Sequence, residues 1–90
     1  MKAVFHVHGR VQGVGFRWFA VDRARALDLA GWVRNEPDGT VSGEAAGDFS
    51  RLEALREILE RGPSSARVSR LDWSLADGEP PLPRPFEVRR

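Results

Sequence analysis

The chain has 90 residues, of which 41% are hydrophobic and 30% are charged, and its formal net charge at neutral pH is +1. This length suits a single domain and leaves no room for two cores, and the composition is that of a soluble globular protein. The near-balanced charge provides no broad cationic face, so it gives no support to a role in nucleic-acid binding.

The chain contains no cysteine, which excludes disulfides, thiolate metal sites and a cysteine nucleophile. Its longest uninterrupted apolar run, Trp18 to Val21, is too short for a signal-peptide core or a membrane span. We therefore expect one cytoplasmic domain over residues 1–90, acting as an enzyme or as a binding module.

A strand is predicted over residues 3–8, because its side chains alternate in character. One face is apolar and carries Ala3, Phe5 and Val7, while His6 and His8 share the other face. Two histidines on one strand face can form part of a metal site, but the spacing provides no third ligand. We therefore expect no metal here.

A glycine-rich loop follows, Gly9-Arg10-Val11-Gln12-Gly13-Val14-Gly15-Phe16-Arg17. Glycine permits positive φ and close approach to the backbone, and a loop at a helix start can direct several N–H groups at an anion. Arg17 adds a planar fork of donors, which favours a phosphate cradle. The Walker A pattern is absent, and the dinucleotide fingerprint lacks its third glycine, where Trp18 stands. A plain strand-to-helix turn with a solvated Arg17 is the competing interpretation, and the local pattern leaves both open.

The next three elements are a helix and a hairpin. Apolar residues at helical spacing predict an amphipathic helix that ends near Leu29: Phe16, Phe19, Ala20, Ala24 and Leu27. Strands are predicted over residues 30–35 and 40–47. Between them, Glu36-Pro37-Asp38-Gly39 is a strong turn signal, so these strands should pair as a hairpin.

The remaining chain predicts a second helix and two further strands. Asp48 or Ser50 can cap the helix, and Ser50 with Glu53 has the form of a capping box. The buried stripe of this helix is predicted to contain Leu52, Leu55, Ile58 and Leu59, and Gly62-Pro63 should end it. A strand is expected over residues 67–75, a proline-rich loop over 77–85, and a short terminal strand over 86–89.

This order of elements predicts an α+β fold. It is a ferredoxin-like βαββαβ sandwich with an additional C-terminal strand, in which two helices cover one face of a largely antiparallel sheet.

Two motifs together resemble the acylphosphatase family, whose members hydrolyse carboxyl-phosphate mixed anhydrides. One is the glycine-rich loop from Gly9 to Arg17, and the other is Gly31-Trp32-Val33-Arg34-Asn35 followed by Asp38-Gly39-Thr40-Val41. The resemblance extends to the closing Phe86-Glu87-Val88-Arg89 and covers essentially the whole chain. It implies the ferredoxin-like fold and an acylphosphatase activity.

The resemblance also implies roles for particular residues. Arg17 would bind the substrate phosphate, together with backbone N–H groups of Val11, Gln12, Gly13, Val14, Gly15 and Phe16. Asn35 would hold and orient the attacking water. No cofactor, no metal and no covalent phosphoenzyme are expected. The partner would be a small acyl phosphate, with inorganic phosphate as product, no membrane or nucleic acid, and a monomeric chain.

The residues themselves are consistent with this chemistry. The loop contains no carboxylate or thiol that could form a covalent intermediate, and no dedicated acid accompanies it. A carboxylate leaves as the base of an acid with a pKa of about 4, so its departure needs no general acid. The loop therefore favours an acyl phosphate over a phosphate monoester. Asn35 cannot act as a base, so it can only orient water.

Two other functions are compatible with the fold class. One is a non-catalytic ferredoxin-like module that binds an anion or RNA, but the strand Val41-Ser42-Gly43-Glu44-Ala45-Ala46 lacks the aromatic residues of an RNA recognition motif. Trp32 and Trp73 fit packing better than base stacking. The other is an accessory domain for carbamoyl phosphate handling in a larger enzyme.

Overall fold

The computed structural model describes residues 1–77 and 81–90. The strands are β1 (Lys2–Arg10), β2 (Ala30–Asn35), β3 (Val41–Ala46), β4 (Arg67–Ala76) and β5 (Glu87–Arg89), and the helices are α1 (Phe16–Ala26) and α2 (Phe49–Arg61). The predicted order of elements is confirmed, and so is the ferredoxin-like fold class. None of the helices in these described ranges is long and apolar enough to cross a membrane.

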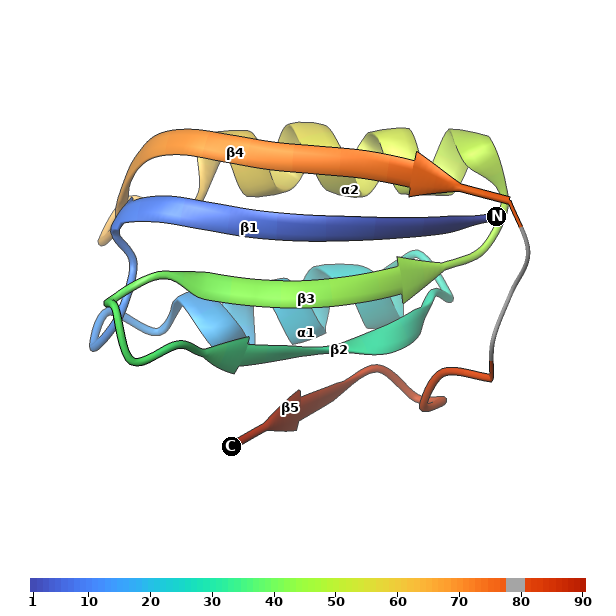
Figure 1. Cartoon of the computed structure of the whole chain (residues 1–90), viewed down its shortest axis with the longest axis horizontal. Helices are drawn as coiled ribbons and strands as arrows, with labels where there is room; N and C mark the ends of the chain where they lie inside the picture. Colours follow the sequence, from blue (N-terminus) through green and yellow to red (C-terminus); the bar gives the residue numbers. More distant parts are fainter. Residues whose placement is uncertain (78–80) are drawn as a thin grey trace.

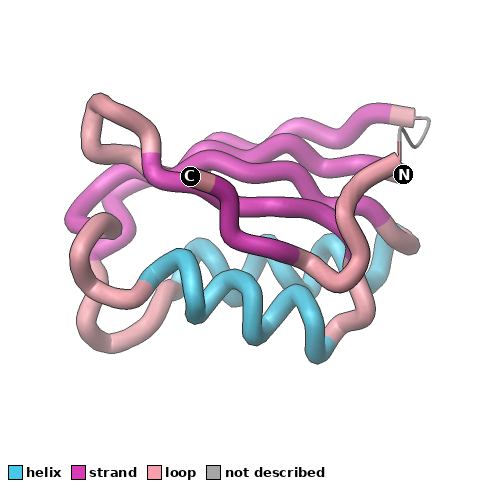
Figure 2. Tube along the Cα trace, turned by 90° about the horizontal axis from the view of Figure 1, so that it is seen from below, coloured by secondary structure: helices cyan, strands magenta, loops and turns pink. Residues whose placement is uncertain are grey.

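The five strands form one sheet in the order β4-β1-β3-β2-β5 (Figure 1). Strand β3 pairs antiparallel with both β1 and β2, and β1 pairs antiparallel with β4. The terminal strand β5 runs parallel to β2 at the sheet edge. Because β1 and β2 flank β3 in the same direction, their C-terminal ends lie at one end of the sheet. Both helices lie on one face of the sheet, which leaves the other face uncovered (Figure 2).

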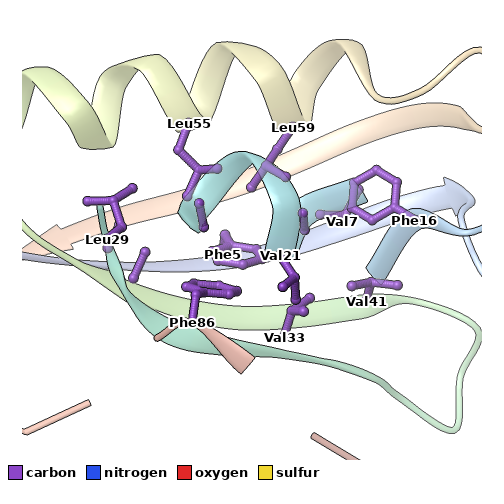
Figure 3. Packing of buried hydrophobic residues seen from close by; sticks show 14 of the residues in the cluster. Phe5, Val7, Phe16, Val21, Leu29, Val33, Val41, Leu55, Leu59 and Phe86 are labelled. Atoms are coloured by element: carbon purple, nitrogen blue, oxygen red, sulfur yellow. The ribbon is translucent and has the colours of Figure 1, made fainter. Parts of the chain in front are cut away.

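The core lies between the helices and the sheet (Figure 3). The predicted apolar face of β1 is confirmed, since Ala3, Phe5 and Val7 are fully buried. Phe86 is also fully buried, just before β5. Complete burial of a leucine or phenylalanine side chain contributes about 1.5–3 kcal/mol. The core therefore holds both ends of the chain.

Helix α1 ends at Ala26, three residues earlier than Leu29, where its end was predicted. Asp28 takes a left-handed conformation with φ of 54°. The N–H of Leu29 then donates to the carbonyl of Ala24, and that of Asp28 to Arg25, which is the hydrogen-bond pattern of a Schellman motif. Leu29 therefore lies in the core outside the helix.

Helix α2 begins with one of the two predicted caps. The Asp48 carboxylate accepts a hydrogen bond from the N–H of Arg51, whereas the predicted capping box of Ser50 and Glu53 is wrong. Ser50 lies inside the helix and donates to Asp48, and Glu53 pairs with Arg56 instead. The helix starts one residue before Ser50, which removes Ser50 from the cap position.

The buried stripe of α2 contains three of the four predicted residues. Leu52, Leu55 and Leu59 are buried, whereas Ile58 is half-buried. The predicted proline-rich loop over 77–85 lies partly outside the described residues, namely at 78–80.

Candidate active site

The glycine-rich loop joins β1 to α1 at the end of the sheet where β2 also ends (Figure 1). Buried residues hold its two ends, Val11 after β1 and Phe16 at the start of α1. Gly13 and Gly15 lie between them with φ of 74° and 79°. Side chains strain that conformation, so both positions require glycine. The core thus fixes the loop while its middle faces solvent.

The backbone of this loop is rich in available donors. Within the described part of the chain, the N–H groups of residues 11–15 donate no hydrogen bond. The first turn of α1 adds further free N–H groups and partial positive charge. Ser65, in the connection from α2 to β4, donates to the carbonyl of Val14 at 2.8 Å and so holds the loop from its other side. This arrangement suits an anion.

Gln12 connects the loop to the β2–β3 hairpin. Its Nε2 donates to the carbonyl of Glu36 at 2.7 Å and to that of Thr40 at 2.8 Å. These are the first and last residues of the hairpin turn, since the N–H of Glu36 donates to the carbonyl of Thr40. Gln12 therefore clamps the turn that follows Asn35 against the loop. The sequence gives no sign of this clamp, because the partners of the Gln12 side chain are 24 and 28 residues away.

Arg17 is the last residue of the glycine-rich motif and the second residue of α1. Its side chain is half-buried and forms no ion pair or hydrogen bond with any residue in the described ranges. A guanidinium without a carboxylate partner keeps all of its donors available for an anion. Its place at the helix N-terminus adds it to the same electropositive end.

Asn35 is the last residue of β2 and is half-buried. Its Oδ1 is buried and accepts no hydrogen bond from the described residues. An unsatisfied buried acceptor costs about 1–3 kcal/mol. Among those residues, Trp73 Nε1 is the only other buried side-chain polar atom without a partner, and that ring packs against Phe5 with ring centroids 6.1 Å apart.

The carboxylates nearest to this end of the sheet are already engaged. The Ser42 hydroxyl and the Arg34 guanidinium both donate hydrogen bonds to the Glu36 carboxylate. These bonds lower the pKa of Glu36, and the bond from Ser42 has the larger effect. The side chain and N–H of Thr40 likewise lower the pKa of Asp38. Both groups are therefore ionised at neutral pH, and neither is poised to donate a proton to a leaving group.

Trp32 and Trp73 lie on the sheet, outside the glycine-rich loop. Trp32 packs between two guanidinium groups, those of Arg34 at 5.2 Å and Arg89 at 5.1 Å from the ring centroid. Arg10 is exposed at the end of β1. Together with the packing of Trp73, these contacts agree with the packing roles expected for both tryptophans.

A cleft of about 410 Å³ lies between the two helices. It contains neither Arg17 nor Asn35 and is lined by Phe19, Arg23, Glu57, Ile58, Arg61, Gly62 and Pro63. This cleft carries Arg23 and Arg61 beside Glu57 but has no backbone donor from residues 11–15, so the loop with its unused N–H groups is the stronger candidate for a phosphate site.

The uncovered face of the sheet brings a third polar side chain to the two histidines of β1. Among the described residues, His6, His8 and Asp72 form one group whose ligand atoms lie within 4.8 Å of one another. Spacing along β1 could not reveal Asp72, which comes from β4 and lies opposite His6 in the strand register.

Comparisons with known proteins match this chain to one family over nearly its whole length. The acylphosphatase family model matches residues 3–88. The chain is 50% identical to an acylphosphatase of Salinibacter ruber over 84 residues, which cover 93% of this chain and 87% of that protein. It also resembles the crystal structure of the Bacillus subtilis acylphosphatase, with a TM-score of 0.94, 32% identity, and coverage of 99% and 98% of the two chains. The crystal structure of Thermococcus kodakarensis HypF matches with a TM-score of 0.83 and 32% identity over all of this chain but only 12% of that one.

Proposed function

Because this chain belongs to the acylphosphatase family, we propose that it hydrolyses the carboxyl–phosphate bond of acyl phosphates to a carboxylate and inorganic phosphate. The glycine-rich loop and Arg17 hold the phosphoryl group, and Asn35 orients the attacking water. Residues 1–90 act as one catalytic domain. The geometry of the loop and the unpartnered oxygen of Asn35 support these roles.

The phosphoryl group would be held by charge-assisted hydrogen bonds. The unused N–H groups of residues 11–15 and the first turn of α1 supply backbone donors, and Arg17 supplies a bidentate fork. Each hydrogen bond to a charged group contributes about 1.5–3 kcal/mol. Donors already in position stabilise the charge that develops in phosphoryl transfer without reorganising during the reaction.

The unpartnered Oδ1 of Asn35 is the observation that carries this proposal. This oxygen is shielded from bulk solvent, so a water enclosed there with the substrate would donate one hydrogen to it and turn a lone pair toward the phosphorus. Asn35 has no titratable group, so it positions the nucleophile and does not deprotonate it. The clamp from Gln12 to the hairpin turn fixes the distance between this water and the loop.

The leaving group determines the substrate class. Glu36 and Asp38 are ionised and hydrogen-bonded, so neither supplies a proton to the departing oxygen. A carboxylate departs without that proton, whereas an alkoxide does not. The proposed reaction is independent of metal and of any cofactor, since the donors of Arg17 and the loop neutralise the phosphate directly.

We further propose that the chain works as a cytoplasmic monomer on a small molecule and needs no nucleic acid. The near-neutral net charge and the lack of aromatic residues on β3 support that choice of substrate. In the described part of the chain, the two helices and the sheet enclose one hydrophobic core.

The test is hydrolysis of benzoyl phosphate beside p-nitrophenyl phosphate, with a chelator present. We expect rapid release of phosphate from benzoyl phosphate and negligible cleavage of the ester. If the folded protein cleaves neither compound, the enzyme proposal fails and the loop is an anion-binding turn in a non-catalytic module. If cleavage of benzoyl phosphate requires added metal, the metal-independent mechanism fails while the activity stands.

A further inference from the structure

We propose that His6, His8 and Asp72 form a binding site for a divalent transition metal, best suited to Zn²⁺, on the uncovered face of the sheet. The site is separate from the hydrolytic reaction, because its ligands lie on β1 and β4 rather than on the loop or β2. Two imidazoles and one carboxylate are a ligand set that zinc takes with a fourth position open to water. Calcium and magnesium prefer oxygen ligands alone.

Strand geometry brings the three side chains together. His6 and His8 are two residues apart on β1, so their side chains share one face, and their ring centroids are 4.7 Å apart. Asp72 lies opposite His6 on β4, and its Oδ2 lies 2.9 Å from His8 Nε2. All three ligand atoms lie within 4.8 Å of one another. Ligands around a tetrahedral zinc ion are separated by about 3.4 Å, given bonds of about 2.0–2.1 Å, so small side-chain rotations complete the site.

The hydrogen bonds of His6 prepare it as a ligand. Thr40 donates its hydroxyl proton to Asp38, so the Thr40 oxygen must accept from His6 Nε2. The proton of the neutral ring is therefore on Nε2, and Nδ1 carries the free lone pair. A histidine that ligates through one nitrogen and donates through the other is the usual arrangement in metal sites, because the outer hydrogen bond fixes the ring.

His8 and Asp72 already attract a cation between them. Arg70 Nη2 lies 3.2 Å from His8 Nε2 and 3.3 Å from Asp72 Oδ2, and its Nε lies 3.1 Å from Asp72 Oδ1. His8 Nε2 cannot both accept from Arg70 and donate to Asp72, so one of these contacts is unsatisfied in the neutral ring. A metal ion would satisfy the nitrogen and the carboxylate together, and it would have to displace Arg70.

Zinc binding to the untagged, metal-free chain tests this proposal. Isothermal titration should show one Zn²⁺ per chain, and Co²⁺ should give the intense visible absorption of a tetrahedral site. His6→Ala, His8→Ala and Asp72→Asn should each weaken binding by about ten-fold or more. Arg70→Ala should strengthen it, because the competing guanidinium is removed. Ser74→Ala, on the same face of β4, is the matched control and should leave affinity unchanged.

Two results would overturn the proposal. One is the absence of stoichiometric binding to the wild-type chain, and the other is equal affinity in the wild type and the three ligand variants. Thermal melting curves, monitored by circular dichroism, establish that each variant is folded. Asp72 is exposed, so Asp72→Asn keeps the test decisive even where a histidine variant does not fold. Hydrolysis of benzoyl phosphate should be the same with zinc and with chelator.

Discussion

At the scale of single residues, the candidate site consists of polar groups whose capacity for hydrogen bonding is unused. Among the described residues, Arg17 has no anionic partner, and no donor forms a hydrogen bond with Asn35 Oδ1. Folded proteins normally satisfy a buried group such as the Asn35 oxygen, because leaving it unpaired costs stability. Groups left unpaired at one end of a sheet are therefore best explained by a ligand that pairs with them.

Arg17→Lys should retain the fold but lose about 100-fold or more in kcat/KM for benzoyl phosphate, which corresponds to about 3 kcal/mol. Lysine keeps the charge and favours helices, but an ammonium cannot reproduce the planar bidentate fork. Steady-state kinetics with benzoyl phosphate measure this loss. Arg56→Lys, on the exposed surface of α2, is the matched control. Near-normal turnover of Arg17→Lys would remove Arg17 from the proposed site.

Sequence patterns predicted the individual residues of this site better than their contacts. Resemblance to a family assigned roles to Arg17 and Asn35, and the apolar spacing from Phe16 onward predicted a helix, which the structure confirms. Those roles remain predictions. The sequence could not predict that Asn35 Oδ1 is buried without a hydrogen-bond partner, because the burial of one atom depends on packing that no local pattern encodes.

At the scale of elements, a loop and a hairpin that are distant in sequence become one unit. Gln12 on the loop holds both carbonyls at the mouth of the β2–β3 turn. The turn itself was predictable from Pro37 and Gly39, and Gly39 indeed takes a positive φ of 92°. The clamp was not, because a glutamine carries no signal of which distant carbonyl it will bind.

Gln12→Leu should lower kcat/KM by about 10–100-fold, because about 1.5–3 kcal/mol of positioning by two hydrogen bonds is lost. Leucine has similar volume but cannot donate, and it leaves two carbonyls without their partner. The unfolding temperature should also fall. Ser65→Ala, which removes a single bond to the loop carbonyl of Val14, is the control and should have the smaller effect on kcat/KM. An unchanged kcat/KM in Gln12→Leu would show that the clamp is not needed for catalysis.

The end of α1 shows where element boundaries escape prediction. The apolar spacing continued to Leu27 and favoured a helix to Leu29, yet the helix ends at Ala26. A glycine usually marks such a C-terminus, and here Asp28 adopts the left-handed conformation instead. Aspartate tolerates this conformation but occurs in many other contexts, so its presence predicts nothing by itself.

At the scale of the whole molecule, the order of elements was predictable but the order of strands was not. Alternation of apolar residues placed Phe5 and Val7 on the core face, and burial confirms it. The sequence left open whether the terminal strand lay at an edge or closed the sheet, and β5 pairs with β2 at an edge. The pairing of β1 with β4 also brings His6, His8 and Asp72 together. This cluster was not predictable, because the register between distant strands depends on the complete fold.

The stability of the whole molecule should fall in acid. Hydrogen bonds lower the pKa of four carboxyl groups at or near the surface below the ordinary values of 4.5 for glutamate and 3.8 for aspartate. The donors are Ser42 to Glu36, Thr40 to Asp38, the N–H of Arg51 to Asp48, and His8 to Asp72. Each of these carboxyl groups has a lowered pKa in the folded state. Its contribution to the free energy of unfolding is therefore fully present when the pH is above its ordinary pKa, and it is lost as the pH falls through the lowered pKa.

Urea unfolding measured from pH 5 down to pH 2.5 tests this expectation. The free energy of unfolding should decrease over this range, and modestly, since solvent screens exposed charges. Asp48→Asn keeps a helix cap that cannot titrate, so it should show a shallower decrease. A free energy of unfolding that stays constant or rises toward pH 2.5 would contradict the assignment.

Asn35→Ala tests whether Asn35 positions the attacking water. The measurement compares kcat for benzoyl phosphate, the inhibition constant of inorganic phosphate and the unfolding temperature in the wild type and the variant. We predict a large loss of kcat with phosphate affinity largely retained. The unfolding temperature should be unchanged or higher, because an unpartnered buried oxygen is removed. Equal losses of kcat, phosphate affinity and stability would show that Asn35 is structural and would contradict the proposed mechanism.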